Sequence, residues 1–416
     1  MILRNLTGRD LLRCAQVCKY FFSVVNHTPD LLYIVELCAE GFVDGPPSDI
    51  SSRERMGLLV RRAGSWRSLV WNKRTTIDMP WARVYHSQRS YVLIIWNWKT
   101  GVKLIDMSSS GGYGLYDFCF LTQYRAMLIT STSSTPCLEV WALDPEASTV
   151  STAQTPVFLY LPDLGFDDFI GFSISQCPLY SDIPRDAPFV KRPGGHVYAI
   201  NIRHSPPRPV SPGLLFVVRH DTIMDLIRRK ERPSGGVTIP WEEWGPENTR
   251  MFCRHMSREH WNSIYNGWIS HDRLLGIFTT SYEEDRVLGP EQILDFNVRP
   301  YMRQSATASG VAGKGQLVTA PTTACVRVDD AGQTVTITTS LPFYSTSIDL
   351  PGTDQRTGFL LDEHYLIGVK FQGYILHTRE SKGCYLSKKL LEDPQHVRLF
   401  EADVENEFNL LGPCRP

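Results

Sequence analysis

Several common functional signatures are missing from this 416-residue sequence. Its ten cysteines form no Cys-x-x-Cys pair, so neither a zinc ribbon nor a thioredoxin-like site is predicted. The sequence has no run of about 18 apolar residues that would predict a membrane span. The N-terminal residues show no apolar segment typical of a signal peptide. We therefore expect reduced thiols and a location in the cytoplasm or the nucleus.

An excess of charge of either sign is also missing. The sequence contains 43 Lys and Arg residues against 44 Asp and Glu residues, which gives a formal net charge of -1. General nucleic-acid binders carry a basic stripe, and this balance predicts no nucleic-acid partner. Hydrophobic residues make up 42% of the chain, so one large domain or a few average ones can form a core.

No catalytic or metal-binding constellation is complete. The glycine-rich run at residues 310–315 lacks the Ser or Thr that follows the lysine of a phosphate-binding loop. Cys253, His255 and His260 supply three possible zinc ligands, but no fourth stands at a typical spacing. We expect these residues to be unligated and the chain to be no enzyme, with no cofactor and no metal.

The first forty residues have a helical pattern. Thr7 can cap a helix N-terminus, and apolar residues then follow at spacings of four, three, four and three, which predicts one apolar helical face. Its members are Leu11, Ala15, Cys18, Phe22 and Val25. Thr28 and Pro29 suit the start of a second helix that ends at Gly41.

A helical linker is expected next, over residues 42–79. Residues 45–52 are rich in Gly, Pro and Ser and predict a loop, and residues 53–69 predict one more helix. Met56, Leu59, Val60 and Ala63 lie on one side of that helix.

From residue 80 the pattern becomes one of short strands. Short apolar or alternating runs are separated by turn residues to the end of the chain, as in all-β folds. A domain of over 300 residues favours a propeller over a sandwich or a barrel, and Trp96 and Trp141 are one blade length apart. The fold expected for residues 80–416 is a divergent β-propeller of six to eight blades, interrupted by long loops at 178–195, 229–250 and 303–320.

One family resemblance is visible. Leu11-Leu12, followed by Val17-Cys18-Lys19 and the aromatic Phe21, resembles the helix pattern of an F-box. The whole chain looks like the F-box proteins that are abundant in mushroom-forming fungi. Further segments that carry this likeness are residues 28–37, 91–101, 241–250, 294–297 and 361–368.

The resemblance implies the role of a substrate-recognition adaptor in an SCF-type ubiquitin ligase. The F-box would dock on a Skp-type adaptor subunit, and the rest of the chain would hold an unknown protein substrate near a ubiquitin-charged enzyme. Residues 1–41 are expected to form a shortened F-box, because the Leu-Pro element and first helix of a full F-box do not precede Leu6-Thr7-Gly8. The candidate partner-binding residues are Leu11, Leu12, Val17, Cys18, Phe21 and Phe22.

Two other readings remain open. A non-catalytic propeller scaffold without a ligase link would pack the N-terminal helices against its own side. An enzyme with a propeller active site would need convergent acids or histidines in a central channel, and the sequence offers no such set. Exposure of Leu11, Val17 and Phe22 in the isolated chain would favour the adaptor over the scaffold.

Overall fold

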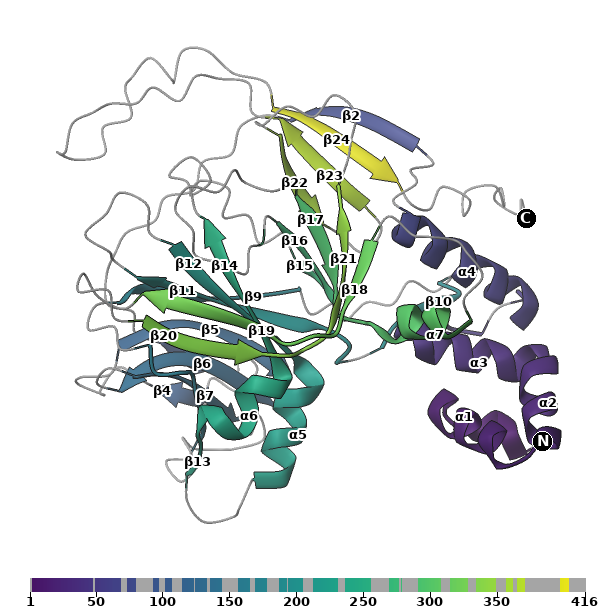
Figure 1. Ribbon diagram of the computed structural model, residues 1–416, viewed down its shortest axis with the longest axis horizontal. Coiled ribbons are helices and arrows are strands. Elements are labelled where there is room, and N and C mark those ends of the chain that lie inside the picture. Colours follow the sequence, from purple (N-terminus) through teal and green to yellow (C-terminus); the bar gives the residue numbers. More distant parts are fainter. Residues whose placement is uncertain are drawn as a thin grey trace.

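A computed structural model places four helices beside a large body built mostly of strands (Figure 1). It describes residues 2–47, 49–68, 73–79, 93–96, 102–106, 114–122, 124–132, 135–143, 156–164, 169–177, 187–192, 194–204, 212–230, 236–255, 269–276, 278, 291–307, 315–327, 334–348, 357–361, 365–370 and 397–403. No helix in these ranges is long and apolar enough to cross a membrane.

The N-terminal helices are short and capped by their own sequence. After a 3-10 turn at Ile2–Asn5 come α1 (Gly8–Val17), α2 (Lys19–His27), α3 (Pro29–Glu40) and α4 (Ser52–Ser68). The Thr7 hydroxyl accepts the backbone N–H of Asp10 at 3.3 Å, which confirms the predicted cap. α3 ends at Gly41 in the left-handed conformation with φ 77°, as predicted. The helix expected at 53–69 is α4.

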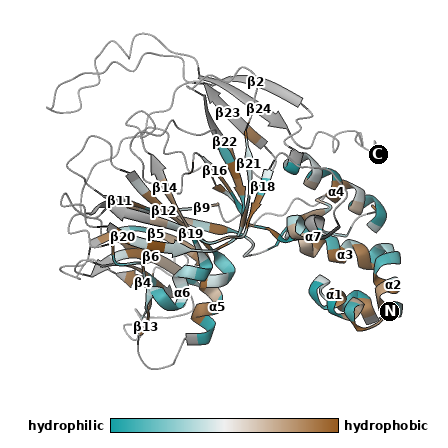
Figure 2. Ribbon diagram, in the orientation of Figure 1, coloured by the Kyte–Doolittle hydropathy of each residue, from teal (hydrophilic) through white to brown (hydrophobic). Residues whose placement is uncertain are grey.

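The single apolar helical face expected from Leu11 to Val25 is wrong. The chain breaks between α1 and α2, where Cys18 adopts an extended backbone with φ -160°. An extended residue interrupts the helical period, so the five residues do not form one continuous helical face, although Leu11 and Val25 still pack in one buried cluster. Figure 1 shows α3 between α1 and α4, and Figure 2 shows that hydrophobic and hydrophilic residues alternate along these helices.

Four sheets of four or five strands make up most of the body. The first, in spatial order, contains β13 (Val237–Ile239), β8 (Val157–Tyr160), β7 (Thr135–Ala142), β6 (Arg125–Thr132) and β5 (Gly114–Thr122). The second contains β14 (Thr249–His255), β12 (Pro212–Arg219), β11 (Val197–His204) and β9 (Phe169–Gln176). All their pairs are antiparallel except β13 with β8.

The other two large sheets are antiparallel throughout. The third contains β15 (Ile269–Ser270), β16 (Arg273–Gly276), β17 (Gln292–Asp295), β21 (Phe343–Ser347) and β18 (Gly315–Val318). The fourth contains β2 (Lys73–Met79), β24 (Val397–Asp403), β23 (Tyr365–Lys370) and β22 (Thr357–Leu361). Met79 lies opposite Val397, so two strands that are far apart in the sequence pair within one sheet.

Three two-stranded pairs complete the strands. They are β1 (Phe42–Asp44) with β10 (Phe189–Lys191), β3 (Ile94–Trp96) with β4 (Lys103–Asp106), and β19 (Thr322–Arg327) with β20 (Thr334–Thr339). β1 and β2 fall within residues 42–79, so this segment contributes strands to the body in addition to the expected helix. The rest of the chain is mostly strands, as predicted, while the closed ring of a propeller remains a prediction.

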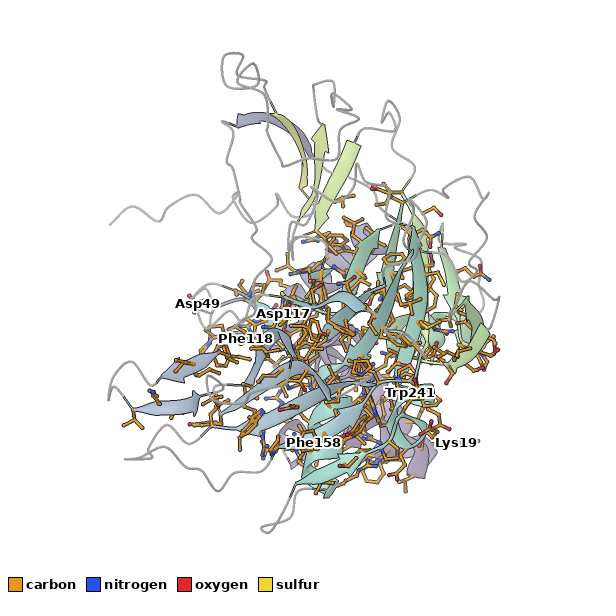
Figure 3. All side chains as sticks on the ribbon, turned by 90° about the vertical axis from the view of Figure 1, so that its left-hand side faces the viewer. Lys19, Asp49, Asp117, Phe118, Phe158 and Trp241 are labelled. Atoms are coloured by element: carbon orange, nitrogen blue, oxygen red, sulfur yellow. The ribbon has the colours of Figure 1, made fainter. Side chains whose placement is uncertain are left out.

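Both faces of the second sheet are buried. Tyr198 and Ile200 pack toward the first sheet, whereas their neighbours Val197 and Ala199 pack toward the third. Because side chains alternate across a strand, burial on both faces requires a continuous apolar run. Asp117 of β5 ties the first two sheets together, since its carboxylate accepts the backbone N–H of Ile174 in β9 at 2.8 Å (Figure 3 labels Asp117 beside Phe118).

Three of the expected long loops contain regular elements. β10 lies within 178–195, and α7 (Arg299–Thr307) and β18 lie within or across 303–320. The segment 229–250 contains β13 and α6 (Trp241–Asn248), and it follows α5 (His220–Lys230). Trp241 (labelled in Figure 3) and Trp244 are buried in the core between the first two sheets. The loop prediction failed because these two rings bury α6 against the sheets.

A fully buried arginine joins three parts of the body. Arg250 of β14 donates from Nε to the Leu341 carbonyl at 2.8 Å, and from Nη2 to the Ala320 carbonyl at 3.2 Å. Its Nη1 donates to the Thr339 carbonyl at 3.3 Å and to the Thr322 hydroxyl. Burial lowers the pKa of this guanidinium to about 10. Arg250 therefore cross-links the second sheet to β19, to β20 and to the segment before β21.

A second buried polar group contains two histidines. The Tyr198 hydroxyl lies 3.0 Å from His196 Nε2 and 2.8 Å from His220 Nδ1, and the two imidazole rings are 4.5 Å apart. Burial lowers the pKa of His196 to about 3 and also lowers the pKa of His220. Both rings are therefore neutral near pH 7, and they fix the start of α5 against β11.

Candidate partner-binding surface of the N-terminal helices

Large apolar side chains are exposed on α1 and α2. The exposed fraction is 40% for Leu12, 72% for Val17, 72% for Tyr20 and 57% for Phe22. Cys18 is also exposed, and Phe21 is half-buried with its ring packed edge-on against Tyr20 at 5.8 Å. Singly exposed apolar residues are ordinary on protein surfaces, but several within one short helical pair make that pair a candidate interaction site. We call these six residues the helical apolar surface.

Leu11 does not belong to this surface. Its side chain is fully buried and packs with Val25 of α2 and with Leu31 and Val35 of α3. The prediction that Leu11 would be exposed to a partner is therefore wrong, because α3 folds back over α1 and covers it. Leu12, Val17, Cys18 and Phe22 of the predicted set remain accessible. Tyr20 was missed, since the helical period drawn through Cys18 placed it on the polar side.

α1 approaches α3 closely at Gly8. A methyl group built on Gly8 would lie 2.5 Å from Cys38 Cβ and 2.8 Å from the Ile34 carbonyl oxygen. Both distances are shorter than any normal contact, so only glycine allows the two helices to pack at this separation. Arg4 of the preceding turn forms an ion pair with Asp30 of α3 and adds a second tie between them.

We predict that Gly8→Ala destabilises the helical unit. The added methyl overpacks the contact with α3, and such changes cost roughly 1–3 kcal/mol. Gly64→Ala in α4 is the matched control, because a methyl there meets nothing within 4 Å and should raise stability by about 0.5–1 kcal/mol through helix propensity. Urea denaturation followed by circular dichroism of the full chain measures both. Equal stability of the two variants would contradict the close approach.

The side of the helical unit away from α1 and α2 is fixed to the body. The Tyr33 hydroxyl lies 2.9 Å from Asp44 Oδ1 and 3.2 Å from the Pro188 carbonyl oxygen. Arg55 of α4 bonds the same carbonyl at 3.1 Å and forms an ion pair with Asp44. Burial raises the pKa of Tyr33, and the hydrogen bond to Asp44 raises it further. We call the contacts between the helices and the body the joint.

α3 forms polar contacts with the segment after β17 and with α7. Asn297 Nδ2 donates to the Ala39 carbonyl at 3.1 Å, and Arg303 Nη2 donates to Glu36 Oε1 at 2.7 Å. Glu40 forms an ion pair with Arg67 of α4, and burial raises the pKa of its carboxyl group. These partners lie more than 250 residues apart in the sequence for Asn297 and Arg303. The segment after β17 and the helix α7 therefore fix the end of α3.

Aromatic rings and cations fill the middle of the joint. Phe42 of β1 and Phe189 of β10 pack edge-to-face at 5.0 Å. The Arg62 guanidinium lies 4.9 Å and Lys191 Nζ lies 4.4 Å from the centre of the Phe42 ring. Burial lowers the pKa of Lys191 to about 8. Because a cation over an aromatic ring is attracted to it, this cluster adds polar and apolar stabilisation together.

The other candidate sites of the sequence lie partly outside the described residues. Cys253 of β14 is buried in the core, where burial raises the pKa of its thiol to about 11. His260 lies outside the described residues, as does the glycine-rich run except for Gly315. Within the part of the chain that the structure describes, no group of three His, Cys, Asp or Glu side chains is placed to hold a metal ion.

Comparison with known proteins finds one match, at the N-terminus. No curated protein and no solved structure matches the chain. Residues 1–33 match the model of the family described as F-box-like, and these residues comprise α1, α2 and the first part of α3. The helical apolar surface thus lies within the matched residues, and residues 1–33 of this protein form an F-box-like domain.

Proposed function

We propose that this protein is the substrate-recognition adaptor of an SCF-type ubiquitin ligase. The F-box-like domain suggests a role in substrate recognition by such ligases. In the proposal, α1 and α2 dock on a Skp-type adaptor subunit, and the β body binds the protein to be modified. The identity of that target protein is left open.

The exposure of the helical apolar surface is the observation that carries the proposal. Val17, Tyr20 and Phe22 are all more than half exposed. Covering a large apolar side chain contributes about 1.5–3 kcal/mol before the costs of association. The scaffold alternative predicts that the body covers these side chains. Instead, α1 and α2 lie on the far side of α3 from α4 (Figure 1).

The joint supports an adaptor role because it fixes the two parts to each other. Tyr33, Arg55 and Asn297 bind backbone carbonyls across the boundary between the helices and the strands. A target held by the body would then keep one orientation relative to the adaptor subunit. In a ligase, that orientation decides which lysines of the target face the ubiquitin-charged enzyme.

We further propose that the body is a divergent propeller. One edge strand of each large sheet contacts an edge strand of the next, in the order β5, β9, β15 and β22. Most strands of each sheet then follow in chain order toward its other edge. β2 joins β24, so an early strand would complete the last blade, as a ring closure requires. A body of this kind fits a non-catalytic binding role in the cytoplasm or the nucleus, without nucleic-acid or membrane partners.

We predict that Phe22→Ala weakens binding of the full chain to a Skp-type subunit by about thirtyfold, which corresponds to roughly 2 kcal/mol. Val17→Asp should weaken binding at least as much, because it places an unpaired charge in the interface. Val60→Asp is the matched control, since Val60 is an exposed valine on α4, away from the surface. Isothermal titration calorimetry with the purified proteins measures all three.

Two outcomes would contradict the proposal. If the wild-type chain does not bind the subunit at tens of micromolar, the ligase role fails and the non-catalytic scaffold remains. If binding occurs but Val17→Asp and Val60→Asp bind equally well, the docking surface lies elsewhere. Circular dichroism of each variant ensures that a loss of binding does not reflect unfolding.

A further inference from the structure

Charges of opposite sign are separated within the helical unit. α1 and α2 contain the cations Arg9, Arg13 and Lys19 but only one acidic residue, Asp10. α3 has the opposite composition, with acidic residues and no Lys or Arg. Since the whole chain has a formal net charge of -1, the excess of positive charge on α1 and α2 is a local feature.

The acidic residues of the unit do not compensate two of these cations. On α1, Asp10 accepts a hydrogen bond from Arg13 at 3.2 Å. Arg9 and Lys19 are exposed, and their side chains form no ion pair with the residues that the structure describes. The acidic residues of α3 are engaged elsewhere, in the ion pairs Arg4 with Asp30, Arg303 with Glu36 and Arg67 with Glu40.

Arg9 and Lys19 are placed where a cation does not help a helix to fold. Arg9 is the second residue of α1, and Lys19 (labelled in Figure 3) is the first residue of α2. The N-terminal end of a helix carries partial positive charge, so a cation there is unfavourable and an acidic residue is favourable. α2 has no acidic residue in its first turn. Residues that oppose local folding preferences in this way are expected at functional sites.

Each of the two cations lies beside an exposed apolar side chain. Arg9 precedes Leu12 by three residues, and Lys19 precedes Phe22 by three residues. Residues three or four apart in a helix lie on the same face. Because Leu12 and Phe22 both belong to the helical apolar surface, this surface is flanked by one uncompensated cation on each helix.

We propose that the helical apolar surface binds an acidic protein surface, on which carboxylates border an apolar groove. The inference rests on the proposed function, and it assigns this chemistry to the Skp-type subunit. Covering Leu12 and Phe22 supplies affinity, whereas Arg9 and Lys19 pair with carboxylates at the rim. Charges at the rim of an interface act mainly on the rate of association, through long-range attraction, and on the choice of partner.

An anionic lipid surface is the other kind of ligand that basic and apolar helices bind. Recognition of such lipids by charge takes clusters of about four to eight Lys or Arg residues. α1 and α2 contain fewer, and Arg13 among them is already paired with Asp10. Leu11 and Val25 are buried in a cluster with residues of α3, so they cannot enter a membrane. The observations therefore favour a protein partner.

The test measures association of the full chain with the purified Skp-type subunit by stopped-flow fluorescence at low salt. We expect Lys19→Glu to lower the association rate constant about tenfold and Lys19→Gln to lower it less. Arg53→Glu is the matched control, since it changes the net charge equally. Arg53 is exposed at the start of α4, which lies on the other side of α3 (Figure 1). The control should change the rate constant by less than about twofold.

Salt separates long-range attraction from the loss of a contact. At about 1 M salt the screening length falls to about 3 Å, so the association rates of the wild-type chain and of Lys19→Glu should converge. Glutamate at the first position of α2 is favourable for the helix, so urea denaturation should find Lys19→Glu at least as stable as the wild-type chain. A lower association rate would then not reflect unfolding.

Two results would overturn the inference alone. One is a double variant, Arg9→Glu with Lys19→Glu, that associates with the subunit as fast as the wild-type chain does. The other is binding of the wild-type chain to vesicles of phosphatidylcholine and phosphatidylserine that the double variant loses, because the cations would then recognise lipid. If the wild-type chain does not bind the subunit, the proposed function fails, and the inference fails with it.

Discussion

Replacing Arg250 with methionine is expected to lower the free energy of unfolding by roughly 3–5 kcal/mol, because it leaves buried polar groups without partners. Methionine fills much of the same space but donates no hydrogen bond. The carbonyl groups of Ala320, Thr339 and Leu341 would each lose the donor that Arg250 supplies. The loss should separate β19 and β20 from the second sheet before the rest unfolds.

Chemical denaturation of the full chain, followed by tryptophan fluorescence, measures this effect. Arg250→Lys should recover only part of the loss, since one ammonium group cannot reach carbonyls on several sides. Arg228→Met is the control, because Arg228 is exposed on α5, where its side chain forms an ion pair with Asp225 at 3.1 Å. It should cost less than about 0.5 kcal/mol. A cost below 1 kcal/mol for Arg250→Met would contradict the cross-linking role.

Acid is expected to destabilise the protein through His196. Burial lowers the pKa of His196 to about 3 in the folded state, whereas an unfolded histidine titrates near 6.5. Between these values the unfolded state binds a proton that the folded state does not. Stability due to this residue is therefore complete above about pH 6.5 and falls by about 1.4 kcal/mol per pH unit as the pH decreases toward 3.

His196→Gln isolates this effect, because glutamine can still bond the Tyr198 hydroxyl but does not titrate. The unfolding free energy of the wild-type chain, relative to that of this variant, should fall by about 2 kcal/mol from pH 7 to pH 5. A parallel pH dependence of the wild-type and His196→Gln chains would show that His196 can be protonated in the folded state.

The local signals of the N-terminal region were readable from the sequence, because they depend on near neighbours. Thr7 caps α1, Gly41 ends α3, and α4 falls within one residue of its predicted bounds. The break at Cys18 was not readable, since the apolar period continues through it. The burial of Leu11 depends on α3 folding back over α1, which is a tertiary contact that helical spacing does not encode.

The strand-rich body was predicted as a class but not in its connections. Alternation predicts strands, and it does not say that β2 pairs with β24 or that α6 buries Trp241 and Trp244. The joint was missed for the same reason, because Tyr33 and Asn297 meet groups that are distant in sequence. The helical apolar surface was mostly predicted, since the resemblance pointed to Leu12, Val17, Cys18, Phe21 and Phe22.

The pairing of β2 with β24 imposes an order on biosynthesis. Residues 73–79 leave the ribosome long before residues 397–403, and at 5–20 residues per second the delay is about 15–60 s. Throughout that time β2 has no partner strand, while α1 and α2 already have α3 to fold against. If the proposed function holds, a nascent chain would be able to bind the Skp-type subunit before the sheet that ends with β2 is complete.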